Sequence, residues 1–241
     1  MLTGFALRRL VALLHDRIDR DQVQALRSTT EGHVCPEIHL AVTLRWLAGG
    51  SYLDVHQGHG IAKSTFWHCV HRTLVAIEQC PELGFEFPST DADLRAVADG
   101  FARKSEQQSF ADAVGAIDGL LVGIQCPAKT AVANPGRYYT RKCKYALNVQ
   151  AICDANRRFS WVSILTPGSV HDGIAFGLTD LAAALSDGWL PAPYYLLGDA
   201  AYSGARGILV PLPGTDLTMA QDSYNFHLSQ LCINIDRKSV V

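Results

Sequence analysis

Apolar side chains in the first hundred residues recur every three to four positions, the spacing typical of amphipathic helices. One stripe runs from Leu7 to Leu14, and residues 36–46 carry a second. The pair Gly49-Gly50 ends that segment, and Ser51 is suited to cap the helix that follows. This part of the chain is therefore predicted to be all-helical.

A longer helix is predicted over residues 62–77, behind the breaks at Gly58 and Gly60. Its expected inward face consists of Phe66, Val70, Leu74 and Ile77. A helix, a short helix, a glycine-bearing turn and a longer helix together have the layout of a helix-turn-helix. The last helix would then offer DNA a set of polar and aromatic side chains: Lys63, Thr65, Trp67, His68, His71 and Arg72. A three-helix bundle with a solvated polar face fits the same pattern.

The pattern changes after a charged connector at residues 102–108. Strand-length stretches rich in Val, Ile and aromatic residues follow, bounded by Pro, Gly, Asn or Asp. The predicted strands are 113–124, 145–154, 158–168 and 194–197, and helices are predicted over 173–188 and 223–238. This order indicates an α/β (α+β) domain. We therefore expect a helical region over residues 1–105 and a second domain over 106–241.

Composition places the chain among soluble globular proteins. Its residues are 48% hydrophobic and 18% charged. No stretch approaches the ~18 consecutive apolar residues of a membrane span, so no membrane association is expected. Seven scattered cysteines without a CxxC pair indicate reduced thiols, as in the cytosol or nucleus.

The net charge of −2 means that any surface for nucleic acid must be local. One basic stretch with interleaved tyrosines is suited to contact phosphates and bases. Its basic residues are Arg137, Arg141, Lys142 and Lys144. A solvated surface is the alternative interpretation of the same stretch.

Carboxylates stand within or directly after the predicted strands. Asp118 interrupts the apolar run AVGAIDGLLVGI, and Asp199 ends the run that leads into LLGDAAY. A desolvated carboxylate is costly unless it is paired, hydrogen-bonded or bound to a metal. If the first and fourth strands are neighbours, these two acids approach each other and repel, and a divalent cation relieves the repulsion. Oxygen ligands of this kind suit Mg²⁺ or Mn²⁺.

Five motifs in this order resemble the nuclease domain of PIF/Harbinger-type transposases and of the Harbinger transposase-derived nucleases, in the DDE endonuclease superfamily. The motifs are AIDG, NPGRYYTRKCKYALNVQAICD, TPGSVHD, LLGDAAY and SYNFHLSQLCINID, and the resemblance covers residues 36–238. It implies an RNase H-like fold that cuts DNA with a divalent metal, Mg²⁺ or Mn²⁺. It also implies that Asp118, Asp199 and Asp236 are catalytic and that Asp172 joins them as a metal ligand.

The resemblance further implies DNA as a partner, a separate Myb-like DNA-binding protein, and a nuclear location, with the cytoplasm as a second location. A homo-oligomer is the other assembly we consider. His171, beside Asp172, is a candidate general base or positioning residue, and a turn residue is the alternative.

Two positions depart from the family pattern. Cys232 stands where the family has arginine, and Asp236 stands where it has glutamate. The family's last helix also normally continues beyond this point, so the nuclease domain looks truncated at its C-terminus. Two functions remain open: an active metal-dependent nuclease, or a catalytically inactive, transposase-derived protein that binds DNA or another protein. A metal-dependent phosphohydrolase for small substrates would leave the helical half unexplained.

Overall fold

The computed structural model describes residues 4–19 and 33–236, without the side chains of residues 107 and 233–236. The chain divides into two compact units, Met1–Gly84 and Phe85–Val241. Within the described ranges, no helix has the length and apolar character needed to cross a lipid bilayer.

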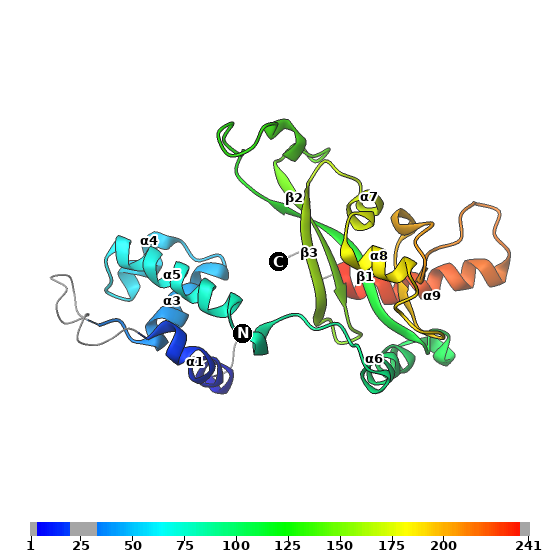
Figure 1. The fold of residues 1–241 in the computed structure, drawn as a ribbon, viewed down its shortest axis with the longest axis horizontal. Coiled ribbons are helices and arrows are strands. Elements are labelled where there is room, and N and C mark those ends of the chain that lie inside the picture. Colours follow the sequence, from blue (N-terminus) through cyan, green and yellow to red (C-terminus); the bar gives the residue numbers. More distant parts are fainter. Residues whose placement is uncertain (1–3, 20–32, 237–241) are drawn as a thin grey trace. The chain divides into compact units, whose positions relative to one another are not determined.

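In residues 4–19 and 33–84, the first unit is built from helices (Figure 1). They are α1 (Gly4–Ile18), α3 (Pro36–Leu47), α4 (Tyr52–Gly58), α5 (Lys63–Glu78) and the 3-10 turn η1 (Pro81–Leu83). One apolar core joins α1, α3 and α5 around Leu14 and Leu40, and a second joins α3, α4 and α5 around Val55 and Phe66. Each helix therefore buries one stripe against its neighbours, as the apolar spacing predicts.

The helices of the first unit end and begin at the glycines and the serine that the sequence predicts. Ser51 caps α4 by accepting from the amide of Leu53 at 3.3 Å. Gly49 and Gly60 have φ values of 87° and 64°, a backbone conformation that glycine adopts without steric cost. The helix stops and the Ser51 cap predicted from the sequence are confirmed.

The inward face of α5 differs from the predicted one. The helix buries Cys69 and Thr73 along with Phe66 and Val70, whereas Leu74 is 39% exposed. Helix α5 packs against both α1 and α3 and contributes to two cores, so its buried face differs from the single stripe predicted for it. This leaves Leu74 on the shoulder of the stripe.

The second unit is built on one five-stranded mixed sheet in the order β3-β2-β1-β4-β5. The strands are β1 (Ala113–Gly123), β2 (Ala146–Cys153), β3 (Phe159–Pro167), β4 (Tyr195–Leu197) and β5 (Ile208–Leu209). β1, β2 and β3 are antiparallel, whereas β4 is parallel to both β1 and β5. The expected mixed α/β architecture is confirmed.

Helices add to two apolar cores of this sheet (Figure 1). The helices are α6 (Asp91–Lys104), α7 (Asp172–Gly177), α8 (Asp180–Ser186) and α9 (Met219–Asp236). This unit also has the 3-10 turns η2 (Glu106–Gln108), η3 (Pro135–Tyr138) and η4 (Ala200–Tyr202), of which η4 adds Tyr202 to a core. One core contains side chains of α7 and α8 with Ile117 of β1, and the other contains side chains of α9 with Ala116. Adjacent residues of β1 thus serve different cores, as the alternation of a strand requires.

Several element boundaries differ from the sequence prediction, and local side chains explain two of them. The helix expected over 173–188 is two helices, because the Thr179 hydroxyl caps α8 by accepting from the amide of Ala182 at 3.2 Å. α9 begins at Met219 rather than at residue 223. Thr218 and Gln221 form a reciprocal cap there, each side chain accepting from the other residue's amide.

The connector expected at 102–108 overlaps the end of α6 and η2. α6 packs against β1, which places it in the second unit. The compact units therefore meet at residues 84 and 85, whereas the domain boundary expected from the sequence follows α6, between residues 105 and 106. β5, two residues long, lies in a stretch that we expected to be a loop.

Candidate functional site

Asp118 and Asp199 belong to neighbouring strands of the sheet. Asp118 lies in β1, and Asp199 comes two residues after β4 ends at Leu197. The two strands pair in parallel with Ala116 opposite Leu197, so both acids follow this pair in the same direction. Asp118 is half-buried and its Oδ1 accepts from the amide of Gly119 at 2.7 Å, whereas Asp199 is exposed. The strand adjacency on which the metal hypothesis depends is thus present.

Asp172 begins α7 and is held by two side-chain amides of β2. Its Oδ1 accepts from Nδ2 of Asn148 at 2.8 Å and from Nε2 of Gln150 at 3.2 Å. Asn148 also donates to the carbonyl of Val170 at 2.9 Å, and both amides are almost fully buried. Oδ2 of Asp172 has no hydrogen-bond partner in the described part of the chain. One carboxylate oxygen is therefore anchored and the other is available.

Two glycines permit close approaches around these acids. A Cβ at Gly119 would overlap Oδ1 of Asp172, so the residue after Asp118 must lack a side chain for α7 to sit where it does. A Cβ at Gly173 would overlap the backbone carbonyl of Ala201 in η4. The segments that carry Asp172 and Asp199 thus approach each other at a distance that only glycine allows.

The turn after β4 is fixed by Asp199 itself. Its Oδ1 accepts from the amide of Ala201 at 2.9 Å and so caps η4. At the end of η4, Tyr202 is 1% exposed and donates its hydroxyl to Oε1 of Gln150 at 2.7 Å. A chain of hydrogen bonds therefore runs from η4 through Gln150 to Asp172.

Three carboxylates act electrostatically on this one buried phenol. Burial raises the pKa of Tyr202 far above its ordinary value, and the negative charges of Asp118, Asp172 and Asp199 raise that pKa further. The hydrogen bond to Gln150 acts in the opposite direction and does not offset them. The hydroxyl consequently stays protonated and remains a donor.

Asp236 is the last residue of α9, and its side chain lies outside the described residues. α9 packs on β1, the strand that carries Asp118. Among the side chains that the structure describes, no three or more His, Cys, Asp and Glu are gathered closely enough to hold a metal ion. The geometry thus places Asp118, Asp172 and Asp199 on segments that meet at this end of the sheet, without a complete ligand shell among the described side chains.

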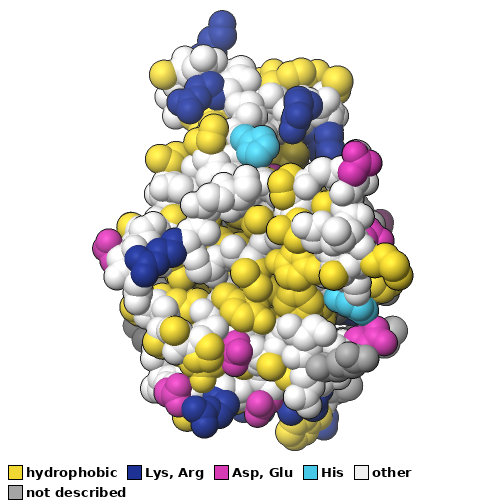
Figure 2. All heavy atoms as spheres, turned by 90° about the vertical axis from the view of Figure 1, so that its right-hand side faces the viewer, with side chains coloured by type: hydrophobic (Ala, Val, Ile, Leu, Met, Phe, Trp, Pro, Cys, Tyr) yellow, Lys and Arg dark blue, Asp and Glu magenta, His cyan; other side chains and the backbone are white. Residues whose placement is uncertain are grey.

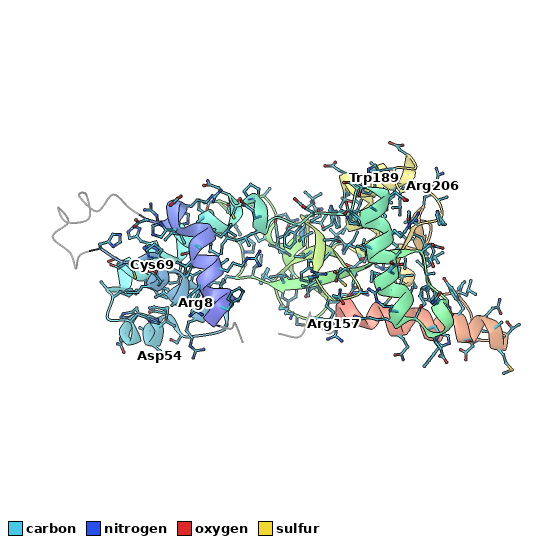
Figure 3. The ribbon with its side chains drawn as sticks, turned by 90° about the horizontal axis from the view of Figure 1, so that it is seen from below. Arg8, Asp54, Cys69, Arg157, Trp189 and Arg206 are labelled. Carbon is cyan, nitrogen blue, oxygen red and sulfur yellow. The ribbon has the colours of Figure 1, made fainter. Side chains whose placement is uncertain are left out.

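His171 precedes Asp172 and is exposed. It stands at the N-cap position of α7 but makes no capping hydrogen bond. With Tyr202 and Arg206, it lines a pocket of about 560 Å³ beside α7 and α8. Arg206, labelled in Figure 3, donates from Nη1 to the carbonyl of Ser186 at 3.0 Å. An exposed imidazole therefore borders both the pocket and the Asp172 segment.

Basic side chains of the segment between β1 and β2 are exposed. Figure 2 shows Lys and Arg side chains gathered at the upper end of one face, above an apolar region. The four basic residues predicted to contact DNA in this segment are all exposed: Arg137, Arg141, Lys142 and Lys144. Tyr139 and Tyr145 bridge the segment, with ring centroids 5.1 Å apart. The amide of Ser169 donates to the carbonyl of Arg137 at 3.3 Å, so this basic segment lies against the stretch that leads to Asp172.

The candidate DNA contacts of the first unit lie on α5. Lys63 and His68 are exposed, and Thr65 is half-buried. The Lys63 ammonium stands over the Tyr52 ring, 5.2 Å from its centroid. Arg72 donates from Nη2 to the carbonyl of Asp19 at 3.0 Å, so its guanidinium holds α5 to the end of α1. The surface of α5 therefore offers Lys63 and His68 more freely than Arg72.

Sequence reasoning missed the groups that hold the acids in place. These are Gly119, Asn148, Gln150 and Tyr202. A signal for two of them exists, because Asn148 and Gln150 are amides separated by one residue within a buried strand, and a strand places such a pair on one face. The partner of those amides could not be read from the chain, because it comes from a segment about twenty residues away.

Comparison with known proteins adds a family to this geometry. A family model described as DDE superfamily endonuclease matches residues 117–238, just over half of the chain. The matched range begins one residue before Asp118 and includes the other three candidate acids. Neither the curated proteins nor the solved structures contain a significant match. On the extent of the family match, this chain belongs to the DDE superfamily endonucleases.

Proposed function

We propose that this protein is a divalent-metal-dependent DNA endonuclease of the transposase type. Membership of the family gives a transposase-like nuclease as the general activity and DNA as the substrate. The observation that carries the proposal is the placement of Asp118 and Asp199 directly after the paired residues of β1 and β4, with Asp172 held against Gly119, the neighbour of Asp118. Three acids from three separate segments are thus brought to one end of the β1-β4 pair, and acids of this kind can hold the metal ions of a nuclease site.

The donor chemistry fits a hard divalent cation. DDE superfamily nucleases normally use divalent metals, and carboxylate oxygens are the ligands that Mg²⁺ and Mn²⁺ prefer. When bound, the metal would activate a water molecule and stabilise the leaving oxygen of the phosphodiester. In this proposal Asp118, Asp199 and Asp236 hold the metal, and Asp172 contributes its unbonded Oδ2. Asp236 would complete the group of metal ligands, which the described side chains do not form by themselves.

Finer features of the proposal concern the fold and its subtype. An antiparallel β1-β2-β3 meander with β4 and β5 added in parallel beside β1 supports an RNase H-like domain. The motifs around Asp118, Asp172 and Asp199 support the PIF/Harbinger subtype. The succession of α3, α4 and α5 supports a helix-turn-helix-like element in the first unit.

DNA would contact two surfaces. One is the basic segment beside Asp172, through Arg137, Arg141, Lys142 and Lys144, where exposed cations neutralise phosphates. The other is α5 of the first unit, through Lys63, Thr65 and His68, with Arg72 holding the helix in place. A separate Myb-like DNA-binding protein, a homo-oligomer and a nuclear location complete the proposal.

An inactive, DNA- or protein-binding derivative is the second candidate. Two observations favour it: Asp236 and Cys232 replace the expected glutamate and arginine, and the described side chains form no complete metal group. An aspartate is one methylene shorter than a glutamate, and a displacement of ~1 Å can cost a catalyst about 100-fold in rate.

Calorimetric titration of the full chain with Mn²⁺ tests the two candidates against each other. The nuclease proposal expects binding by the parent, loss of binding in Asp118→Ala and in Asp199→Ala, and no change in Asp216→Ala, an exposed acid outside the cluster. Mn²⁺-dependent nicking of plasmid DNA should likewise be lost in Asp118→Ala and Asp199→Ala and retained in Asp216→Ala. Failure of the parent to bind Mn²⁺ would reject the nuclease and favour the inactive derivative.

A further inference from the structure

We propose that Gln150 is a positioning residue that orients the Asp172 carboxylate and fastens it, through Tyr202, to the turn after β4. The inference rests on the proposed metal-dependent function, because its consequence is the geometry of the acids before a metal binds. It concerns side chains that the nuclease chemistry itself does not require. Three features of the structure support it.

The first feature is the complete use of the Gln150 side chain. Its Nε2 donates to Oδ1 of Asn148 at 2.7 Å and to Oδ1 of Asp172 at 3.2 Å. Its Oε1 accepts from the hydroxyl of Tyr202 at 2.7 Å. Turning the amide over would bring its oxygen against the carboxylate and its nitrogen against a donor hydroxyl. The network therefore fixes one orientation of the amide.

The second feature is what this orientation does to Asp172. Two N–H donors converge on Oδ1 and so fix the direction of the carboxylate. With Oδ1 occupied, Oδ2 is the oxygen left for a cation. Gln150 is 2% exposed, so water does not compete for its bonds. The carboxylate is consequently held as an oriented ligand.

The third feature is the mechanical link to Asp199. Tyr202 ends η4, and Asp199 caps the start of the same turn. Gln150 therefore connects two of the three acids through hydrogen bonds on β2. The approach of Gly173 to Ala201 brings the same two segments into backbone contact, which leaves the network little freedom to shift. Loss of Gln150 should loosen both acids together.

The test compares Mn²⁺ affinity in four full-length proteins: the parent, Gln150→Met, Tyr202→Phe and Thr166→Val. Thr166 is the matched control, since its buried hydroxyl lies on the neighbouring strand opposite Asn148 and has no partner in the described part of the chain. We expect Gln150→Met to weaken Mn²⁺ binding about 10- to 100-fold, the usual cost of removing a group that orients a metal ligand. Tyr202→Phe should weaken binding less, and Thr166→Val should match the parent.

A double variant separates positioning from general support of the fold. Because Tyr202 acts on the carboxylate through Gln150, Gln150→Met with Tyr202→Phe should bind Mn²⁺ no more weakly than Gln150→Met alone. Thermal unfolding is measured on every variant, and Tyr202→Phe, which removes one oxygen, carries the test if Gln150→Met does not fold. A lower melting temperature with unchanged Mn²⁺ affinity would overturn the inference.

Failure of the inference and failure of the proposed function give different results. Parent protein that does not bind Mn²⁺ overturns the metal-dependent function and the positioning role with it. If the parent binds Mn²⁺ and both Gln150→Met and Tyr202→Phe bind it with the affinity of the parent, the positioning role alone is overturned.

Discussion

Asp118 stands where β1 leaves the core. The strand is fully buried from Ala113 to Ile117 and becomes half-buried at Asp118. A carboxylate one position earlier would be desolvated at high cost, whereas here it reaches partial solvent and the amide of Gly119. The embedded charge that the apolar run suggests is thus a charge at the edge of the core.

Tyr202 gives this region a measurable alkaline response. Its pKa is raised in the folded protein above the ordinary value of 10.0, by burial first and by the three carboxylates second. The stabilising contribution is therefore complete below pH 10 and is lost as the pH rises above it, where the unfolded chain releases the proton. The loss should approach about 1.4 kcal/mol in the free energy of unfolding per pH unit.

Urea unfolding at pH 9 to 11 measures this response, with Tyr202→Phe as the comparison. The variant lacks the titrating group, so its stability should fall less steeply with pH than that of the parent. Equal slopes for the two proteins would show that Tyr202 ionises as readily in the folded state as in the unfolded chain.

At the scale of elements, the contact of α7 with η4 brings the acids together. Asp172 opens α7 and Asp199 caps η4. Neither element is long enough to hold its position alone, because α7 has six residues and η4 three. Phe176 and Tyr202 pack edge to face with centroids 5.7 Å apart, and this contact anchors both elements in one core.

Gly173→Ala should separate these two elements. The new Cβ would overlap the carbonyl of Ala201, and backbone on both sides cannot move aside as a side chain can. We expect a loss of about 1–3 kcal/mol in the free energy of unfolding, together with weaker Mn²⁺ binding. Gly177→Ala, in the same helix with open space around it, is the control and should stabilise by about 0.4–1 kcal/mol. Equal stabilities for the two variants would contradict the close approach.

At the scale of the whole molecule, a net charge of −2 coexists with a basic segment. Phosphate neutralisation depends on the local density of cations rather than on the net charge of the protein. The exposed cations between residues 137 and 144 supply that density beside the Asp172 stretch. A DNA strand bound there would have its phosphates beside the stretch that leads to Asp172.

The salt dependence of DNA binding tests this surface without any metal. Replacing Arg141 and Lys142 by glutamine should reduce the slope of log affinity against log salt by about 1.8, since each lost phosphate contact contributes about 0.9. Fluorescence anisotropy with duplex DNA measures the slope. The matched control replaces Arg8 and Arg9, two exposed arginines of α1, and removes the same charge. Equal slopes in the two double variants would indicate a long-range charge effect instead.

Much of the fold could be predicted from the sequence because neighbouring residues determine it. Helix stops at Gly49 and Gly60, the Ser51 cap and the strands around Asp118 follow from backbone conformation and side-chain alternation, which neighbouring residues determine. The split at Thr179 was missed because a cap there interrupts a continuous apolar pattern. The early start of α9 was missed because its cap at Thr218 precedes the stretch from which the helix was predicted. Leu74 was misplaced since helix spacing does not say how many neighbours a helix has.

By itself, the sequence determined which carboxylates interrupt apolar strands, because a charged residue within or directly after an apolar run is visible in the sequence. It also determined the order of motifs that places the chain in its family. Only the tertiary structure decided that Asp172 meets Gly119 and that Gln150 joins Asp172 to Tyr202. Those contacts link residues far apart along the chain, and hydrogen-bond partners at such separation are selected by the packing of the sheet and not by local propensity.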